Sequence, residues 1–150
     1  MNKPAKVLIA DDVEAISALI QSFLPAAAFE TRVAHDGAQA LEIFLEWRPE
    51  VVLLDIMMPI QSGYQVLKAI RAQGADTVVV MLTSRSSQDD VVSCSKIGID
   101  GYLVKPIRPK SLRAAVLKGL ARHDPERAKA LAELLAVAPD MDGANQRRLS

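Results

Sequence analysis

The stretch Val51-Val52-Leu53-Leu54-Asp55-Ile56-Met57-Met58-Pro59 places four aliphatic residues directly before one carboxylate, and a proline follows four residues later. Consecutive apolar residues without alternation are typical of a strand that helices cover on both faces. Asp55 then stands at the C-terminal end of that strand, where open α/β sheets commonly bind ligands. A lone aspartate after a strand is about as often a simple turn residue, so the other strands must decide between these two interpretations.

Four further segments are predicted as strands, at residues 7–10, 29–34, 77–82 and 102–104. Between them, apolar residues recur at helical spacing, beginning with the stripe Ile16, Leu19, Ile20, Phe23 and Leu24. Asp36 with Gln39 and Ser62 with Gln65 have the spacing of helix capping boxes. Five strands that alternate with five helices predict a doubly wound (βα)5, flavodoxin-like sheet of five parallel strands. Residues 86–97 contain few apolar side chains, which predicts a weakly held and mobile fourth helix.

The composition limits the classes of function. The chain has 150 residues and room for one domain with a core, and its 18 basic and 18 acidic residues balance to a net charge of zero. No overall field therefore favours nucleic acid or an anionic membrane. The single cysteine, Cys94, excludes an internal disulfide and is interpreted as a small helix residue. The absence of a long apolar segment predicts a cytoplasmic protein without a membrane contact.

The composition changes after His123, which predicts a domain at residues 1–122 and a helical extension with a disordered tail at 123–150. Asp124 and Pro125 are a typical helix start, and a narrow apolar stripe follows at Leu131, Leu134, Leu135 and Ala138. Such a helix packs on its own domain or frays in solution, and the alternative is a contact with a partner or a homodimer.

The predicted strands bring polar side chains to one edge of the sheet: Asp11 and Asp12 from the first, Asp55 from the third, Thr83 from the fourth and Lys105 from the fifth. Three carboxylates without a nearby cation would repel one another, so some are protonated or a divalent metal is bound. Oxygen ligands favour Mg²⁺, which a phosphate oxygen commonly completes. Lysine and threonine on the other side suit phosphoryl oxygens, and an aspartate is a known nucleophile for phosphoryl transfer.

These residues resemble the signatures of the receiver domains of two-component response regulators. The matching motifs are Asp11-Asp12, Leu54-Asp55-Ile56-Met57-Met58-Pro59, Gly63-Tyr64, Thr83-Ser84 and Gly101-Tyr102-Leu103-Val104-Lys105-Pro106, in that order along residues 6–122. The resemblance implies a signalling switch, not an enzyme, whose Asp55 accepts a phosphoryl group from a sensor histidine kinase or a phosphotransfer protein.

The resemblance also implies the roles of the neighbouring residues. Mg²⁺ would be held by Asp11, Asp12, Asp55 and the backbone carbonyl of Met57, Lys105 would pair with the phosphoryl oxygens, and the Lys105–Pro106 peptide would be cis. On phosphorylation, Thr83 would shift toward the phosphoryl group and Tyr102 would rotate inward. The surface of the fourth helix, fifth strand and fifth helix would then change and signal to a downstream protein.

Three positions are expected to tune the lifetime of the phosphorylated state. Met57 and Arg85 are at the two positions that flank the site in this family, and Ser84 replaces the usual alanine or glycine. An apolar thioether cannot orient an attacking water, and an arginine can shield the phosphoryl group. We therefore expect slower dephosphorylation than in the fastest chemotaxis regulators.

Other interpretations remain at this point. The chain could be the receiver part of a longer regulator, or a docking module that works without phosphate. A phosphatase of the haloacid dehalogenase type is disfavoured because Met57 stands where those enzymes have a second aspartate. No basic recognition helix is evident, so no direct contact with nucleic acid is expected. Tyr102 could be an ordinary strand aromatic, and His35 and His123 are interpreted as surface residues without a role. The kinase, the target and the pathway are not encoded in any recognisable motif.

Overall fold

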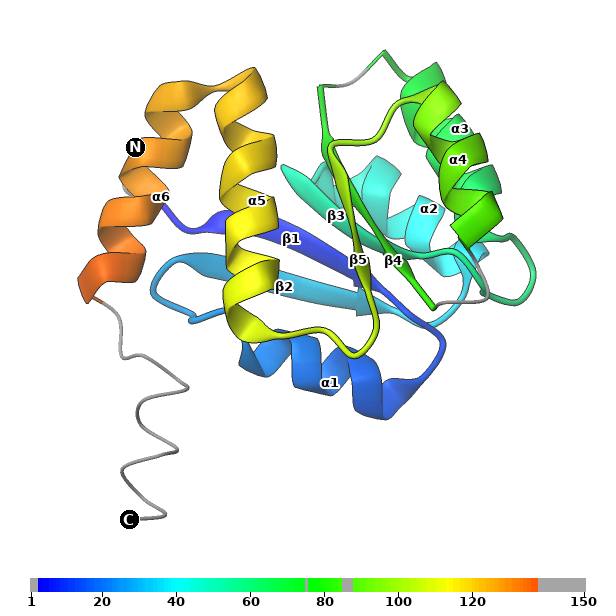
Figure 1. The fold of residues 1–150 in the computed structure, drawn as a ribbon, viewed down its shortest axis with the longest axis horizontal. Helices are drawn as coiled ribbons and strands as arrows, with labels where there is room; N and C mark the ends of the chain where they lie inside the picture. The colour runs from blue at the N-terminus through cyan, green and yellow to red at the C-terminus, as the bar shows by residue number, and fades with distance from the viewer. Residues whose placement is uncertain (1–2, 75, 85–87, 138–150) are drawn as a thin grey trace.

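A five-stranded parallel sheet forms the centre of the molecule (Figure 1). The structure is a computed structural model, and it describes residues 3–74, 76–84 and 88–137. The strands are β1 (Ala5–Ala10), β2 (Phe29–Ala34), β3 (Val51–Asp55), β4 (Val78–Thr83) and β5 (Gly101–Val104), and their order across the sheet is β2-β1-β3-β4-β5. The predicted doubly wound fold is confirmed.

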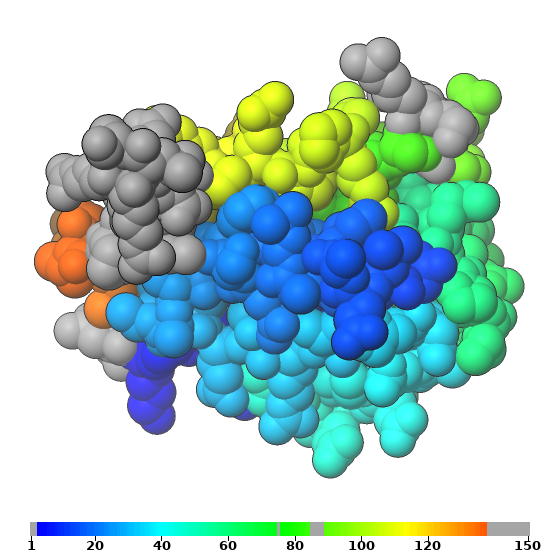
Figure 2. All heavy atoms as spheres, turned by 90° about the horizontal axis from the view of Figure 1, so that it is seen from below, coloured from blue at the N-terminus to red at the C-terminus, as the bar shows by residue number. Residues whose placement is uncertain are grey.

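Six helices in the described part of the chain cover the two faces of the sheet. They are α1 (Glu14–Ser22), α2 (Gly37–Trp47), α3 (Gly63–Ala72), α4 (Gln88–Ile97), α5 (Pro109–His123) and α6 (Pro125–Val137). One hydrophobic cluster joins α1, α5 and α6 to the sheet, and a second joins α2, α3 and α4 to it. In Figure 2, α1 lies across the centre in blue and α5 lies above it in yellow.

The two clusters explain why the strands are apolar without alternation. Successive residues of β3 enter opposite layers: Val51 and Leu53 pack under α1 and α5, and Val52 and Leu54 pack under α2 and α3. All of them are fully buried. No described helix combines the length and the apolar character that crossing a membrane would require.

The helices differ from the sequence-based expectations in two details, the capping contact of α2 and the buried face of α1. Ser62 forms a full capping box with Gln65, whereas Gln39 Oε1 accepts from the backbone N–H of His35 instead of that of Asp36. The expectation that Leu19 faces the core is wrong, since 51% of it is exposed. Ser17 is buried on the core side of α1, and its hydroxyl donates to the Glu14 carbonyl at 2.9 Å.

The fourth helix buries few apolar side chains, as its sequence predicts. Val91 and Cys94 are its buried side chains among those the structure describes, and Val92 is exposed. The predicted start of this helix at Ser86 lies outside the described residues.

The extra helix α6 packs against its own domain, which is the first of the two alternatives. Ala128 and Leu131 are buried in the same cluster as α1 and α5, and Arg127 forms an ion pair with Glu50 at 2.9 Å. Ala138 and the tail that follows lie outside the described residues. Most of the apolar stripe of α6 is therefore already occupied within the monomer.

Two backbone features shape the C-terminal edge of the sheet. The Lys105–Pro106 peptide is cis, as the resemblance implied. Gly63 begins α3 directly against β3, where a Cβ atom would overlap the Asp55 carbonyl oxygen. Only glycine lets α3 start this close to the end of β3.

Candidate functional site

The acidic residues predicted at the strand ends converge. One carboxylate oxygen from each of Asp11, Asp12 and Asp55 lies within 4.8 Å of the others. Asp11 and Asp55 are buried, at 0% and 5% exposure, and Asp12 is exposed. Because β1 and β3 are hydrogen-bonded neighbours with parallel direction, their C-terminal residues meet at one edge.

Lys105 lies inside this cluster, which differs from the expectation of carboxylates without a nearby cation. Its ammonium is 2.9 Å from Asp11 Oδ2 and 3.5 Å from Asp55 Oδ2. One ammonium among three carboxylates still leaves two negative charges uncompensated at the cluster when all three acids are ionised. Burial lowers the pKa of Lys105, but contact with Asp11 and the charge of Asp55 raise it more, so this lysine stays protonated.

The pKa of Asp55 rises to about 6. Burial is the largest cause, and the negative charge of Asp11 adds to it. Lys105 and the backbone N–H of Met57, which donates to Asp55 Oδ1 at 3.3 Å, act in the opposite direction. Above pH 6 the Asp55 carboxylate is therefore mostly ionised, although its surroundings disfavour the charge.

The cluster fits a small, hard divalent cation. Among the described residues, Asp11 Oδ2 is the one buried side-chain oxygen without a hydrogen bond, and its close neighbour is the Lys105 ammonium. Three carboxylates, two of them buried, supply the oxygen donors that Mg²⁺ prefers, and the exposed Asp12 leaves the cluster open to solvent on one side.

Of the two residues expected to switch, Thr83 ends β4 and Tyr102 lies within β5, opposite Met81 of β4. Thr83 is 1% exposed, and its hydroxyl donates to the Ser84 carbonyl at 2.9 Å. Tyr102 is 51% exposed, so its ring lies on the outside of β5. The movement of these two side chains on phosphorylation stays a prediction.

The predicted tuning residues are less fully described. The Met57 side chain is 65% exposed beside the site, and Ser84 is partly buried. Arg85 lies outside the described residues.

The structure describes two further residues near this edge of the sheet to which the sequence analysis assigned no role. His35 Nδ1 lies 3.3 Å from the Asp11 carbonyl oxygen, so this histidine contacts the loop that carries Asp11 and Asp12. Ile60 has a φ of 72°, and the N–H of Gln61 donates to the Pro59 carbonyl across it at 2.8 Å. A β-branched residue rarely adopts this positive φ, and nothing in the local sequence signals it.

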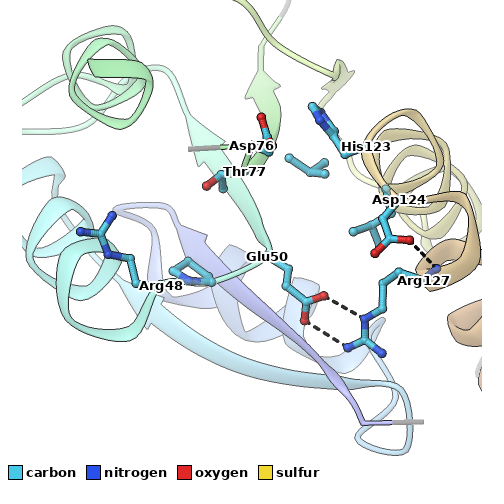
Figure 3. A pocket seen from close by; sticks show the side chains of 10 residues that line it. Arg48, Glu50, Asp76, Thr77, His123, Asp124 and Arg127 are labelled. Carbon is cyan, nitrogen blue, oxygen red and sulfur yellow. Dashed lines mark hydrogen bonds and ion pairs between the residues drawn. The ribbon is translucent and has the colours of Figure 1, made fainter. Parts of the chain in front are cut away.

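Other hollows lie beside and opposite the acidic cluster. An apolar groove of about 330 Å³ between α1 and the start of α5 is lined by Ile16, Leu19, Ile20, Lys105, Pro106 and Ile107. A pocket of about 410 Å³ lies at the other end of the sheet, where Arg127 bridges to Glu50 (Figure 3). The acidic cluster does not line that pocket.

His123 is not the idle surface residue that the sequence indicated. Its Nε2 atom lies 2.8 Å from Asp100 Oδ1, and the Asp100 side chain is 3% exposed. The other Asp100 oxygen accepts from the Val79 N–H at 2.9 Å and from Arg71 at 3.3 Å. This group is far along the strands from Asp55 and joins the ends of α3 and α5 to β4.

Comparisons with known proteins agree with these observations. The family model of the response regulator receiver domain matches residues 7–117. The chain is 38% identical over 137 residues to the DNA-binding response regulator MtrA of Mycobacterium leprae, a match that covers 91% of this chain and 58% of that protein. It is 39% identical over 145 residues to the transcriptional regulatory protein PrrA of the same organism, covering 95% and 62%. The chain thus spans about three-fifths of these curated relatives.

Solved structures give the same result. The REC domain of AraT, a response regulator from Geobacillus stearothermophilus, is 30% identical with a TM-score of 0.76, and the match covers 82% of this chain and 98% of that chain. The chemotaxis response regulator CheY4 of Vibrio cholerae is 33% identical with a TM-score of 0.72, covering 78% and 99%.

Proposed function

Because the chain belongs to the response regulator receiver domain family of two-component systems, we propose that it is a phosphorylation-dependent switch whose phosphoacceptor is Asp55. The observation that carries this proposal is a nearly buried carboxylate at the tip of β3, between two further acids and one lysine. A pKa of about 6 keeps most of Asp55 ionised at neutral pH, as a nucleophile requires.

In the proposed reaction, an Asp55 oxygen attacks the phosphorus of a phosphohistidine. The new O–P bond forms as the P–N bond to the histidine breaks, and the donor imidazole leaves with the electron pair. Lys105, already 3.5 Å from Asp55, would hold the phosphoryl oxygens, and Thr83 would hydrogen-bond to them. Mg²⁺ held by Asp11, Asp12, Asp55 and the Met57 carbonyl would neutralise charge on the carboxylates and the phosphoryl group.

The signal would leave the domain through α4, β5 and α5. Movement of the Thr83 hydroxyl toward the phosphoryl group would make room for Tyr102, which is now exposed on β5. The partners in this proposal are a histidine kinase or phosphotransfer protein and a downstream protein, and the reactions take place in the cytoplasm. The domain supports its own phosphorylation and dephosphorylation and transforms no separate substrate.

The lifetime of the phosphorylated state is part of the proposal. The exposed Met57 thioether beside the site has no group that orients water, and with Ser84 and Arg85 it would slow hydrolysis. Half-decay within seconds in a buffer with Mg²⁺ would contradict this.

Intact mass spectrometry tests the phosphoacceptor. Incubation with Mg²⁺ and acetyl phosphate should add ~80 Da to the wild type, the mass of one phosphoryl group. Asp55→Asn and a sample treated with EDTA should stay unmodified. Asp90→Asn, which changes an exposed acid on α4, should be modified like the wild type. An adduct that persists in Asp55→Asn would show that another residue is the acceptor.

A second candidate follows from the share of the relatives that the chain covers. The chain would be the receiver part of a longer regulator and would control an output domain. Equal partner binding in phosphorylated and unphosphorylated samples would instead favour a docking module that works without phosphate.

A further inference from the structure

β2 is the one strand of the sheet from which no site residue was predicted. The segment after it, His35-Asp36-Gly37, nevertheless contacts two other loops, and we call it the β2–α2 turn. One of these loops is residues 11–13, between β1 and α1, and the other is residues 56–62, between β3 and α3. Most of the proposed Mg²⁺ ligands belong to these two loops, so the turn touches both halves of the metal site.

The first contact is a side-chain hydrogen bond to the backbone of Asp11. His35 Nδ1 lies 3.3 Å from the Asp11 carbonyl oxygen. A carbonyl oxygen only accepts, so the imidazole donates this bond through its Nδ1–H group. The Asp11 N–H donates to the Ala34 carbonyl at 3.0 Å, and Asp11 Oδ1 accepts from the Val13 N–H at 2.9 Å. With these three groups of Asp11 held, its remaining oxygen, Oδ2, faces Lys105 and the cluster.

The second contact joins the same turn to the loop after β3. The Gly37 N–H donates to the Pro59 carbonyl at 3.3 Å. A Cβ atom at Gly37 would overlap the Gln61 carbonyl oxygen, so the approach depends on glycine. Because β1 lies between β2 and β3 in the sheet, the turn reaches past the end of β1 to touch this loop. Both contacts are to backbone carbonyls and leave the carboxylates of the cluster free for a cation.

We propose that the β2–α2 turn positions the two loops for Mg²⁺ and that His35 is a positioning residue of the metal site. The Asp11 carbonyl and the Asp12 nitrogen belong to one planar peptide group. A bond from His35 to that carbonyl therefore fixes the plane from which the exposed Asp12 side chain extends. This inference rests on the proposed function, because Mg²⁺ is the cation of the proposed reaction.

Two other roles for His35 fit less well. A direct metal ligand would need a ring nitrogen at the cluster, but the group of close ligand atoms found among the described residues contains three aspartates and no histidine. A purely structural role would need burial, and His35 is exposed. The loss of one exposed hydrogen bond should hardly change the free energy of unfolding, so its consequence is expected at the metal site.

Three substitutions at residue 35 separate the hydrogen-bond donor from the ring. His35→Ala removes both, His35→Phe keeps a ring without a donor, and His35→Asn keeps an amide donor close to the position of Nδ1. The probe is Mn²⁺, which also prefers oxygen ligands and whose EPR signal reports the free ion. His35→Ala and His35→Phe should bind Mn²⁺ about three- to tenfold more weakly than the wild type, and His35→Asn within about twofold of it.

The matched control is Gln73→Ala, which removes an exposed neutral side chain at the end of α3 and should bind Mn²⁺ like the wild type. All of these variants should unfold at the wild-type urea midpoint. Wild-type Mn²⁺ affinity in His35→Ala would overturn the proposal. Equal weakening in His35→Ala and His35→Asn would also overturn it, because the donor would then not matter.

Phosphorylation by acetyl phosphate gives a second measurement of the same role. His35→Ala should need about three- to tenfold more Mg²⁺ for its half-maximal rate and should reach the wild-type rate at saturating Mg²⁺, because the imidazole acts only through the metal ligands. A lower rate at saturating Mg²⁺ with an unchanged half-maximal concentration would contradict a positioning role.

Gly37→Ala tests the second contact. Its Cβ atom would displace the loop of residues 56–62, so Mn²⁺ affinity should fall at least as far as in His35→Ala. Wild-type affinity in Gly37→Ala would overturn the role of this contact. The His35 variants keep the proposal testable if Gly37→Ala does not fold.

These measurements separate the positioning role from the phosphorylation switch. Mn²⁺ binding that weakens in His35→Ala, in a wild type that gains no ~80 Da adduct, would confirm the positioning role and contradict the switch. A normal adduct on Asp55 with equal Mn²⁺ affinity in wild type and His35→Ala would confirm the acceptor and overturn the positioning role. Mn²⁺ binding that is absent from the wild type, or that persists in Asp11→Asn/Asp12→Asn, would overturn the metal site and the positioning role together.

Discussion

The two ends of the sheet use the same kinds of charged side chain in opposite ways. At one end, the Asp100 side chain is buried and both of its carboxylate oxygens have partners. One oxygen accepts from the Val79 N–H and pairs with Arg71, and the other pairs with His123 and Arg122. At the other end, three carboxylates share one lysine, and a buried Asp11 oxygen makes no hydrogen bond. A carboxylate with several partners holds helices to strands, whereas an excess of carboxylates would favour a bound cation and adds to the rise in the pKa of Asp55 that burial causes.

This contrast predicts that replacing Asp100 lowers the free energy of unfolding, whereas neutralising Asp55 raises it. Asp100→Ala should lower the free energy of unfolding by about 3 kcal/mol, because it leaves Arg71 and a strand N–H without their buried partner. Urea denaturation measures this change. Asp90→Ala, at an exposed position of α4, should change stability by less than about 0.5 kcal/mol. A loss below about 1 kcal/mol for Asp100→Ala would show that the Asp100 contacts are not a structural hub.

Asp55→Asn should instead stabilise the protein, by about 1–3 kcal/mol at pH 8 without Mg²⁺. The raised pKa of about 6 means that the folded state favours the neutral form of Asp55. Its stabilising contribution is complete below the unfolded pKa of about 4, is lost as pH rises to about 6, and changes no further above that. Urea unfolding across this range should show the decline in the wild type and not in Asp55→Asn. A destabilised Asp55→Asn would contradict the electrostatic account.

Mg²⁺ should raise the free energy of unfolding only by binding to the acidic cluster of Asp11, Asp12 and Asp55. At about ten times its Kd, binding to the folded state adds about 1.4 kcal/mol. Thermal unfolding with Mg²⁺ and with EDTA should differ for the wild type and for Asp100→Asn, and the difference should vanish in Asp11→Asn/Asp12→Asn. Stabilisation of equal size in that double variant would place the cation elsewhere.

The smallest expected effect concerns the loop beside Asp55. Ile60→Gly should raise the free energy of unfolding by up to about 1 kcal/mol, because glycine accepts a φ of 72° without strain. Ile60→Ala keeps the Cβ atom and is the matched control, with a smaller change expected. Since 76% of Ile60 is exposed, little packing is lost in either variant. A clear destabilisation in both would show that the side chain itself holds the loop.

Much of the acidic cluster at the C-terminal ends of the strands could be predicted, because its sequence signals are local. Each strand is a short apolar run, and parallel strands separated by helices must bring their C-terminal residues to one edge. Asp11, Asp55, Thr83 and Lys105 were predicted there for this reason. The cluster around Asp100 at the other end of the sheet had no such signal, since Asp100, Arg71 and His123 come from separate parts of the chain with no shared motif.

The sequence by itself determined the five strands, the order of strands and helices and the acids at the strand ends, because hydrophobic period and chain direction are local properties. Only the tertiary structure decided that Lys105 neutralises part of the acidic cluster, that Leu19 faces solvent, that α6 packs on its own domain and that Asp100 joins α3 to α5. Each of these depends on distances between residues far apart in the chain. Such distances follow from how the layers pack against one another and are absent from any local pattern.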